Sequence, residues 1–160
     1  MAIPTVLWAL EASTFDRKLY PVMRRGEEDD MSAFTVEFDN RAGELARLCE
    51  AMAAHGVNIV VCGAAHGDTG TVAFIADDER GARDALEGAN IEYNERPALT
   101  IRMENVAGAG ATAFRKLADA GVNIDLLLPV RVSAEEFLAV ICAENLDAAA
   151  SALGDQVVSN

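Results

Sequence analysis

Apolar and polar residues alternate from position 34, where Phe34, Val36 and Phe38 are separated by Thr35 and Glu37. A period of two is typical of a strand that buries one face. After a polar turn at residues 39–42, the apolar residues change to helical spacing, and a glycine stands at position 56, where a helix is expected to stop. The pattern predicts a strand, a turn and a helix.

Three further elements are expected before the pattern starts again. Residues 57–62 and 71–76 are rich in β-branched and apolar residues, and turn residues at 66–70 separate them. Asp77 and Asp78 can cap a helix that ends near Leu86, and residues 91–95 form a last strand. The order βαββαβ is the ferredoxin-like arrangement, an antiparallel sheet with both helices on one face.

The chain repeats this pattern at an offset of 65 residues. Residues 34–59 and 99–124 align without a gap, and ten of the 26 aligned pairs are identical. The second copy has expected strands at 98–103, 122–128 and 136–143, helices at 108–120 and 146–153, and a last strand at 157–158. We therefore predict an α+β fold of two ferredoxin-like βαββαβ units packed side by side, with antiparallel sheets and helices on one face.

The repeat divides the chain into a tail at 1–31, a first unit at 32–96 and a second at 97–160. The tail holds an amphipathic segment at 6–19 with Trp8, and a mixed charge run at 24–30, and it can be partly disordered. Met31 could be the natural start of the protein. Because each unit is small for a core of its own, the two should pack on each other or on another chain.

Composition excludes several classes of function. The net charge of −13 argues against nucleic-acid binding through phosphates. No apolar stretch approaches the roughly 18 residues of a membrane span, and the start lacks the basic flank of a signal peptide. The chain has three cysteines, Cys49, Cys62 and Cys142, and they show no CxxC spacing. A disulfide framework or a zinc site is therefore not expected, and we interpret the three as reduced core residues of a cytoplasmic protein.

Each copy keeps two asparagines 18 residues apart, Asn40 with Asn58 and Asn105 with Asn123. An Asn side chain offers donors and an acceptor without charge, which suits the carboxylate and ammonium of a free amino acid. Backbone N–H groups at a helix start favour the carboxylate, and a glycine at 43 or 108 allows close approach. The alternative is local, because asparagine in turns often bonds its own backbone. Repetition in both copies favours the ligand interpretation.

The motif Asn-Arg-Ala-Gly at 40–43, followed by Gly-Val-Asn-Ile at 56–59, resembles the ACT domain, a small amino-acid-sensing module, over residues 33–159. The first copy is most similar to the serine-sensing domain of phosphoglycerate dehydrogenase, where paired domains hold the effector between two asparagines. In the side-by-side pairing usual in that family, one eight-stranded sheet would place Asn40 opposite Asn123 and Asn105 opposite Asn58. The resemblance implies these ligand-binding residues: Asn40, Arg41, Ala42, Gly43, Asn58, Ile59, Asn105, Val106, Ala107, Gly108, Asn123 and Ile124.

Two departures from the family pattern indicate unequal sites. Ala42 and Ala107 replace the usual proline, so the turn loses a fixed φ. The second copy has Val106 in place of Arg41.

Neither His55 nor His66 has a partner that the repeat preserves, and no metal spacing or nucleophile motif is present. Catalysis, a metal and a cofactor are therefore not expected.

The sequence thus predicts a non-catalytic sensor that binds a free amino acid at the seam between its units and regulates a metabolic partner. A biosynthetic enzyme and a second copy of the chain are its expected partners, with no nucleic acid and no membrane. The main alternative is a ligand-free regulatory subunit that docks on such an enzyme. An unrecognised enzyme on the same fold is a third, because fold alone does not set function.

Overall fold

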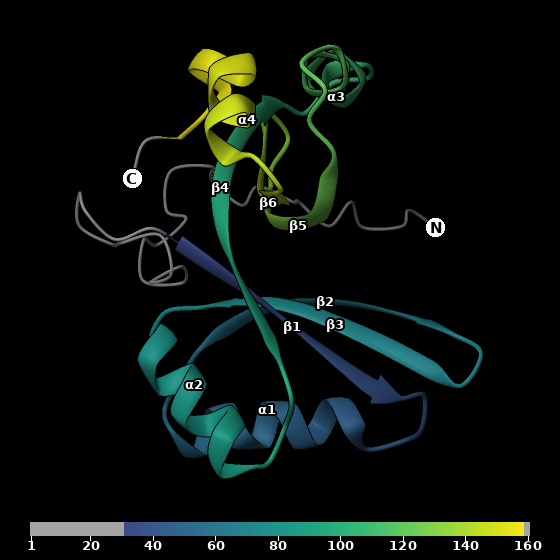
Figure 1. The fold of residues 1–160 in the computed structure, drawn as a ribbon, viewed down its shortest axis with the longest axis vertical. Coiled ribbons are helices and arrows are strands. Elements are labelled where there is room, and N and C mark those ends of the chain that lie inside the picture. Colours follow the sequence, from purple (N-terminus) through teal and green to yellow (C-terminus); the bar gives the residue numbers. More distant parts are fainter. Residues whose placement is uncertain (1–30, 159–160) are drawn as a thin grey trace, which may run out of the picture.

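The computed structural model describes residues 31–158, so the expectations for the tail, its segment at 6–19 and its charge run at 24–30, lie outside the described residues. The fold class is confirmed: two βαββαβ-like units follow each other along the chain (Figure 1). The elements are β1 (Met31–Asp39), α1 (Glu44–Ala54), β2 (Ile59–His66), β3 (Thr69–Ala76), α2 (Glu79–Gly88), β4 (Asn94–Glu104), α3 (Ala109–Asp119), β5 (Ile124–Val132), β6 (Glu136–Ala143), α4 (Leu146–Leu153) and the 3-10 helix η2 (Gly154–Gln156).

Strand β4 belongs to both units. Its first half pairs antiparallel with β1, where Met31 lies opposite Ala98, and its second half pairs with β6. The result is a six-stranded sheet in the order β2-β3-β1-β4-β6-β5. The expected eight-stranded sheet is wrong, because the strands expected at 91–95 and 98–103 are one strand and Val157 makes only a bridge to Ile101. Pro97 favours extended backbone at the residue before it, so the chain continues without a turn. The division between residues 96 and 97 stays a prediction, and it falls inside β4.

Each half of the sheet is covered by its own helices. In the first unit Phe34 stacks on Phe74 with ring centroids 5.1 Å apart, and both rings are buried beneath α1 and α2 with Leu48 and Met52. In the second unit an equivalent core lies under α3 and α4, built on Ile101, Leu117, Ile141 and Leu153. The alternating pattern of β1 and the helical spacing of α1 therefore meet in one core.

The faces of the sheet that carry no helices pack on each other. Figure 1 shows four layers, with α3 and α4 at the top, β5 and β6 below them, then β1–β3, and α1 and α2 at the bottom, while β4 runs through both strand layers. A third core cluster joins the two inner layers, and we call it the inter-unit core: Met31, Ala33, Ile75, Ala98, Leu128, Val130, Val140 and Cys142. The small units thus complete their burial against each other, as their length requires.

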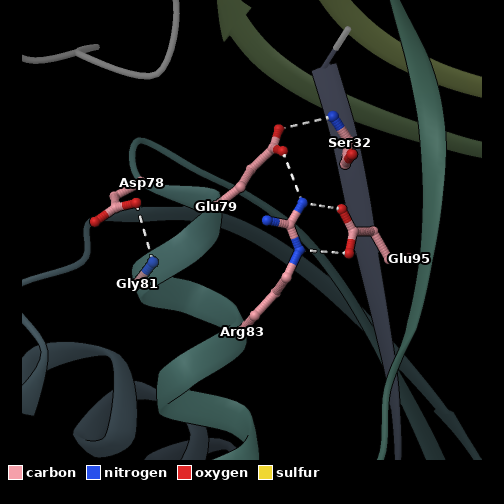
Figure 2. A network of polar contacts seen from close by, with 6 residues as sticks. All are labelled: Ser32, Asp78, Glu79, Gly81, Arg83 and Glu95. Carbon is pink, nitrogen blue, oxygen red and sulfur yellow. Dashed lines mark hydrogen bonds and ion pairs between the residues drawn. The ribbon is translucent and has the colours of Figure 1, made fainter. Parts of the chain in front are cut away.

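A network of charged side chains ties α2 to β1 and β4 (Figure 2). Glu79 is only 7% exposed and accepts a hydrogen bond from the Ser32 backbone N–H at 2.8 Å. Arg83 bridges Glu79 at 3.3 Å and both carboxylate oxygens of Glu95 at 2.5 and 2.8 Å. The hydrogen bond from Arg83 holds the pKa of Glu95 below its ordinary value, although partial burial opposes the shift.

We expect Arg83→Gln to lower the free energy of unfolding by about 1 kcal/mol at neutral pH, the upper end for a partly exposed ion pair. The pKa of Glu95 is lower in the folded than in the unfolded chain, so its contribution is present above the unfolded pKa of about 4.3. That contribution is lost as pH falls through the folded pKa. Urea unfolding at neutral and acidic pH should therefore show the two proteins converging in acid.

The matched control is Arg80→Gln, because Arg80 is an exposed residue of the same helix. It should change stability by less than about 0.5 kcal/mol at every pH. A gap between wild type and Arg83→Gln that stays constant down to acidic pH would contradict the assignment to Glu95.

The cysteines only partly follow expectation. Cys142 is buried in the inter-unit core, but Cys49 and Cys62 are exposed, so the prediction that all three lie in the core is wrong. Cys49 lies on the outer face of α1, and Cys62 lies on β2, a strand at the sheet edge. Both histidines are exposed. None of the helices within 31–158 is long and apolar enough to cross a membrane.

Candidate functional site

Each unit has a pocket beside the turn that carries its first repeated asparagine, Asn40 or Asn105. The first-unit pocket, of about 310 Å³, lies between that turn and the β2–β3 hairpin, and the second-unit pocket, of about 200 Å³, lies at the matching place. Positions related by the 65-residue offset line both: Phe38 and Met103, Asp39 and Glu104, Asn40 and Asn105, Arg41 and Val106, Glu44 and Ala109, Leu45 and Gly110, Val72 and Phe137.

Asn40 and Asn105 make equivalent hydrogen bonds in their two units. Asn40 donates from Nδ2 to the Gly67 carbonyl at 2.8 Å, and Asn105 donates to the Ser133 carbonyl at 2.5 Å. Each amide thereby holds the tip of its own hairpin against the turn. The side-chain oxygen of each has no hydrogen-bond partner within residues 31–158. The repetition of this asparagine therefore has a local cause, and one acceptor stays available to a ligand.

The second asparagine of each copy lies elsewhere. Asn58 and Asn123 follow the far ends of α1 and α3, and an 11-residue helix is about 16 Å long. Asn123 donates a side-chain hydrogen bond to Asp125 at 3.0 Å. Neither Asn58 nor Asn123 lines a unit pocket. In the described part of the chain, no hydrogen bond joins Asn40 to Asn123 or Asn105 to Asn58. Neither unit pocket is lined by both members of an expected pair, so the pairing stays a prediction.

The pockets border helix N-termini that no side chain caps. Gly43 and Gly108 stand at the N-cap positions with φ of 102° and 92°, a left-handed conformation that favours glycine. The first intrahelical bonds are Arg47 N–H to Gly43 and Thr112 N–H to Gly108. The backbone N–H groups just before them have no carbonyl acceptor within the helix and lie at its positive end. One of them, Ala109 N–H, donates to the Val106 carbonyl of the preceding turn at 3.2 Å, so it is not free for a ligand. A carboxylate is the ligand group that the remaining donors favour.

The electrostatics differ between the two units. In α1, Glu44 lies in the first turn and receives Arg41 Nε at 2.6 Å and Arg47 Nε at 3.5 Å. The hydrogen bond to Glu44 raises the pKa of Arg41, so its guanidinium stays charged. The first turn of α3 holds no acid. The start of α1 therefore carries an acid whose charge two arginines offset, whereas the first turn of α3 carries no acid and position 106 no arginine.

A third and larger depression, the C-terminal pocket, flanks α3 on its other side with a volume of about 810 Å³. Lys116 Nζ donates to Gln156 Oε1 at 2.9 Å, and Arg102 pairs with Glu136 at 2.9 Å within it. It shares Met103, Glu104, Val106 and Ala109 with the second-unit pocket. The predicted residues Val106, Ala107 and Gly108 thus line this depression.

Sequence reasoning missed the acidic residue of each unit pocket. Asp39 and Glu104 directly precede the conserved asparagines and line the two pockets. The repeat alignment carries this signal, because both positions are acidic although they are not identical. Ile59 and Ile124 are partly buried and pack against the cores of their units, and their expected contact with a ligand stays a prediction. Within residues 31–158, no group of three His, Cys, Asp or Glu side chains is placed to hold a metal ion.

Comparison with known proteins identifies the fold. No protein-family model matches the chain, and a search of curated proteins finds no match. The structure is similar to protein BT0572 from Bacteroides thetaiotaomicron, at a TM-score of 0.72 and 23% identity, over 81% of this chain and 92% of that one. It is also similar to the ligand-free regulatory subunit of aspartate kinase from Thermus thermophilus, at a TM-score of 0.62 and 22% identity, over 81% of this chain and 93% of that one.

A third similar structure is described as a putative C-terminal regulatory domain of aspartate kinase from Porphyromonas gingivalis W83. It has a TM-score of 0.56 and 15% identity, over 81% of this chain and 93% of that one. In each comparison the match spans most of both chains, so the likeness includes both units and their arrangement. The chain has the α+β fold of these proteins.

Proposed function

We propose that this protein is a non-catalytic regulatory subunit that binds a free amino acid in its unit pockets and regulates a metabolic enzyme. The observation that carries the proposal is the duplicated pocket: each copy combines an acid, an asparagine and an uncapped helix N-terminus. The hairpin of each unit uses only the asparagine side chain. The hairpin therefore does not explain why the acid before the asparagine also recurs in the second copy.

The groups of each pocket suit a zwitterion. The ligand carboxylate accepts hydrogen bonds from the free N–H groups at the start of α1 or α3. The ligand ammonium donates to the carboxylate of Asp39 or Glu104 and to the open side-chain oxygen of Asn40 or Asn105. The first-unit pocket leaves more room for the side chain of the ligand than the second-unit pocket, which is smaller and is lined by Phe114 and Phe137.

Two likenesses support the regulatory part of the proposal. The motifs around the asparagines resemble the ACT domain, and similar structures are described as regulatory subunits of aspartate kinase. By analogy, the partner of this chain is a biosynthetic enzyme. We place the ligand within each unit rather than at a seam between asparagine pairs, because each unit pocket is lined by only one asparagine of its pair.

The second candidate is a regulatory subunit that binds no ligand. One observation favours it: the amide groups of Asn40 and Asn105 are already used by the hairpins. Under this alternative the conserved asparagines serve the fold alone.

Thermal unfolding against the twenty amino acids at millimolar concentration separates the two candidates, with serine first in the panel. A ligand at one hundred times its dissociation constant should add about 2.7 kcal/mol to the free energy of unfolding. We expect one or a few amino acids to raise Tm, and we expect Asp39→Asn together with Glu104→Gln to abolish the rise.

Asn145→Ala is the matched control for a loss of stability without a loss of the site. Asn145 caps α4 by accepting the Ala148 N–H at 2.9 Å, away from all three pockets. Its replacement should lower Tm through a cost of about 1 kcal/mol and leave the ligand-induced rise intact. A panel in which no amino acid changes Tm would refute the sensor and leave the ligand-free subunit.

A further inference from the structure

The two units differ in the side chains at the mouths of their pockets. Large apolar residues of the second unit stand where the first unit has a charged or a small residue. Gly70 and Phe137 are equivalent, because each lies opposite the last but one residue of β1 or β4. Three equivalent pairs show the difference, with the first-unit residue named first: Arg41 and Val106, Ala65 and Val132, Gly70 and Phe137. The second unit is therefore apolar at places where the first is not.

These apolar residues form one exposed surface beside the second-unit pocket. Val132 and Val106 are 61% and 60% exposed, the highest values among the large apolar side chains of residues 31–158. The turn and the hairpin tip that carry them adjoin, because Asn105 binds the Ser133 carbonyl. Clustered apolar side chains of this kind mark an interaction surface. We call the group the second-unit apolar surface: Val106, Phe114, Val132 and Phe137.

The chain contains a segment whose sequence suits this surface. Residues 6–19 lie outside the described part, and they have apolar residues at helical spacing: Trp8, Ala12, Phe15 and Leu19. The residues between them at 13–14 and 16–18 are polar or charged. Such an amphipathic pattern is typical of a segment that buries one face against an apolar partner.

The start of β1 brings this segment close to the surface. Met31 packs in the inter-unit core with Val130 of β5, two positions before Val132, which is about 7 Å along a strand. The linking residues 20–30 can span up to about 36 Å when extended. Strand β5 is at the sheet edge, so the chain can pass round it without crossing another strand. The segment therefore reaches the surface within one chain.

The charges of the two partners are complementary. Residues 1–25 carry four basic and two acidic side chains, whereas the described part carries nine basic and 20 acidic ones. Arg17 and Lys18 belong to the segment itself. Glu104 lines the second-unit pocket and Glu135 lies in the adjoining hairpin tip, and neither makes a salt bridge to another described residue. Opposite charges at the rim of an apolar contact favour its formation and its register.

We propose that residues 6–19 dock on the second-unit apolar surface of the same chain and cover the second-unit pocket. The apolar stripe of the segment buries the exposed valines, and its basic residues meet the acids at the rim. The first-unit pocket stays open, because its mouth lacks these apolar residues. An amino acid that enters the second-unit pocket must then displace the segment; this consequence rests on the proposed function, whereas the docking itself does not.

The fluorescence of Trp8 tests the docking in the full chain, because Trp8 is its only tryptophan. Wild type should emit at short wavelength and be weakly quenched by acrylamide, with no change on dilution, since the contact is intramolecular. Val132→Lys places a charge in the apolar contact and repels the basic residues of the segment. We expect this variant to shift the emission to the longer wavelength of the urea-unfolded chain and to raise the quenching constant several-fold.

Leu45→Lys is the matched control, because Leu45 is a large apolar residue that is 49% exposed on α1 of the first unit. It should leave the emission of Trp8 unchanged. Circular dichroism checks that each variant is folded, and Val106→Arg, which installs the first unit's residue, replaces Val132→Lys if that variant is not.

Three results would overturn the proposal. Trp8 could be as accessible in wild type as in urea, its protection could be lost on dilution, as expected for docking on a second copy, or its protection could survive Val132→Lys. A protected Trp8 that responds to Val132→Lys in a protein whose Tm no amino acid changes would support the docking and refute only the sensor.

Discussion

Replacing Phe34 by alanine should lower the free energy of unfolding by about 3–5 kcal/mol. The ring is fully buried in the first-unit core, where it stacks on Phe74 at 5.1 Å and meets Tyr93 at 5.9 Å. The Arg83 guanidinium lies 6.0 Å from the centroid of the Phe34 ring, so Phe34 connects the core to the charged network of α2. Because domains are stable by only about 5–15 kcal/mol, this loss is a large share of the total.

Urea unfolding followed by circular dichroism measures the effect, and Phe34→Leu is the matched control. Leucine keeps most of the buried apolar volume, so that variant should lose about 1.5 kcal/mol or less. Equal losses for the two variants would mean that the apolar volume of leucine recovers nothing, so that the stability at this position would come from the aromatic ring itself. A small loss for alanine would contradict the packing of β1 beneath α1 and α2.

Leu128→Ala should cost about 2–5 kcal/mol, and Leu127→Ala about 1 kcal/mol or less. The two leucines are neighbours on β5, but Leu128 is fully buried in the inter-unit core and Leu127 is 37% exposed. Deleting the Leu128 side chain leaves a cavity between the inner faces of the sheet, whereas the Leu127 position can be filled by water.

The comparison tests the four-layer arrangement directly. Chemical unfolding of both variants under identical conditions gives the two losses. Similar small costs would show that the helix-free faces do not pack together in solution. A single cooperative transition in wild type, monitored by a probe in each unit, would further indicate that the units unfold together.

Most elements could be predicted from local patterns. The strand at β6 and the helix at α4 have the predicted bounds, because period and turn residues agree there. The cap at Asp78 is also present, since its side chain accepts the Gly81 N–H at 3.0 Å. The helix stops at Gly56 and Gly121 follow, with φ of 69° and 70°. These features depend on a few neighbouring residues, so a short stretch of sequence specifies them.

The path of β4 could not be predicted in this way. A short link at Arg96 and Pro97 is compatible with a turn between two strands or with one long strand, and only the pairing partners decide. In the structure β1 takes the first half of β4 and β6 takes the second. Those contacts are distant in sequence, and their geometry turned an expected side-by-side sheet of eight strands into a six-stranded sheet with packed inner faces.

The candidate site divides along the same line. The asparagines, the left-handed glycines and the acids are visible in the repeat, because each acts within one turn and its hairpin. Whether Asn40 lies near Asn123 is not visible in the sequence, since it depends on how the units are oriented. Likewise, Cys49 is exposed because it lies on the outer face of α1, and Cys62 is exposed because β2 lies at the edge of the sheet.

The sequence by itself therefore determined the two units, their βαββαβ order and the residues around each helix start, because hydrophobic period, turn chemistry and repetition are properties of neighbouring residues. Only the tertiary structure decided which faces pack, which strand both units share and which strands lie at the sheet edges. Those features arise from burial and pairing between residues far apart in the chain, where many arrangements satisfy the same local pattern and side-chain packing selects one.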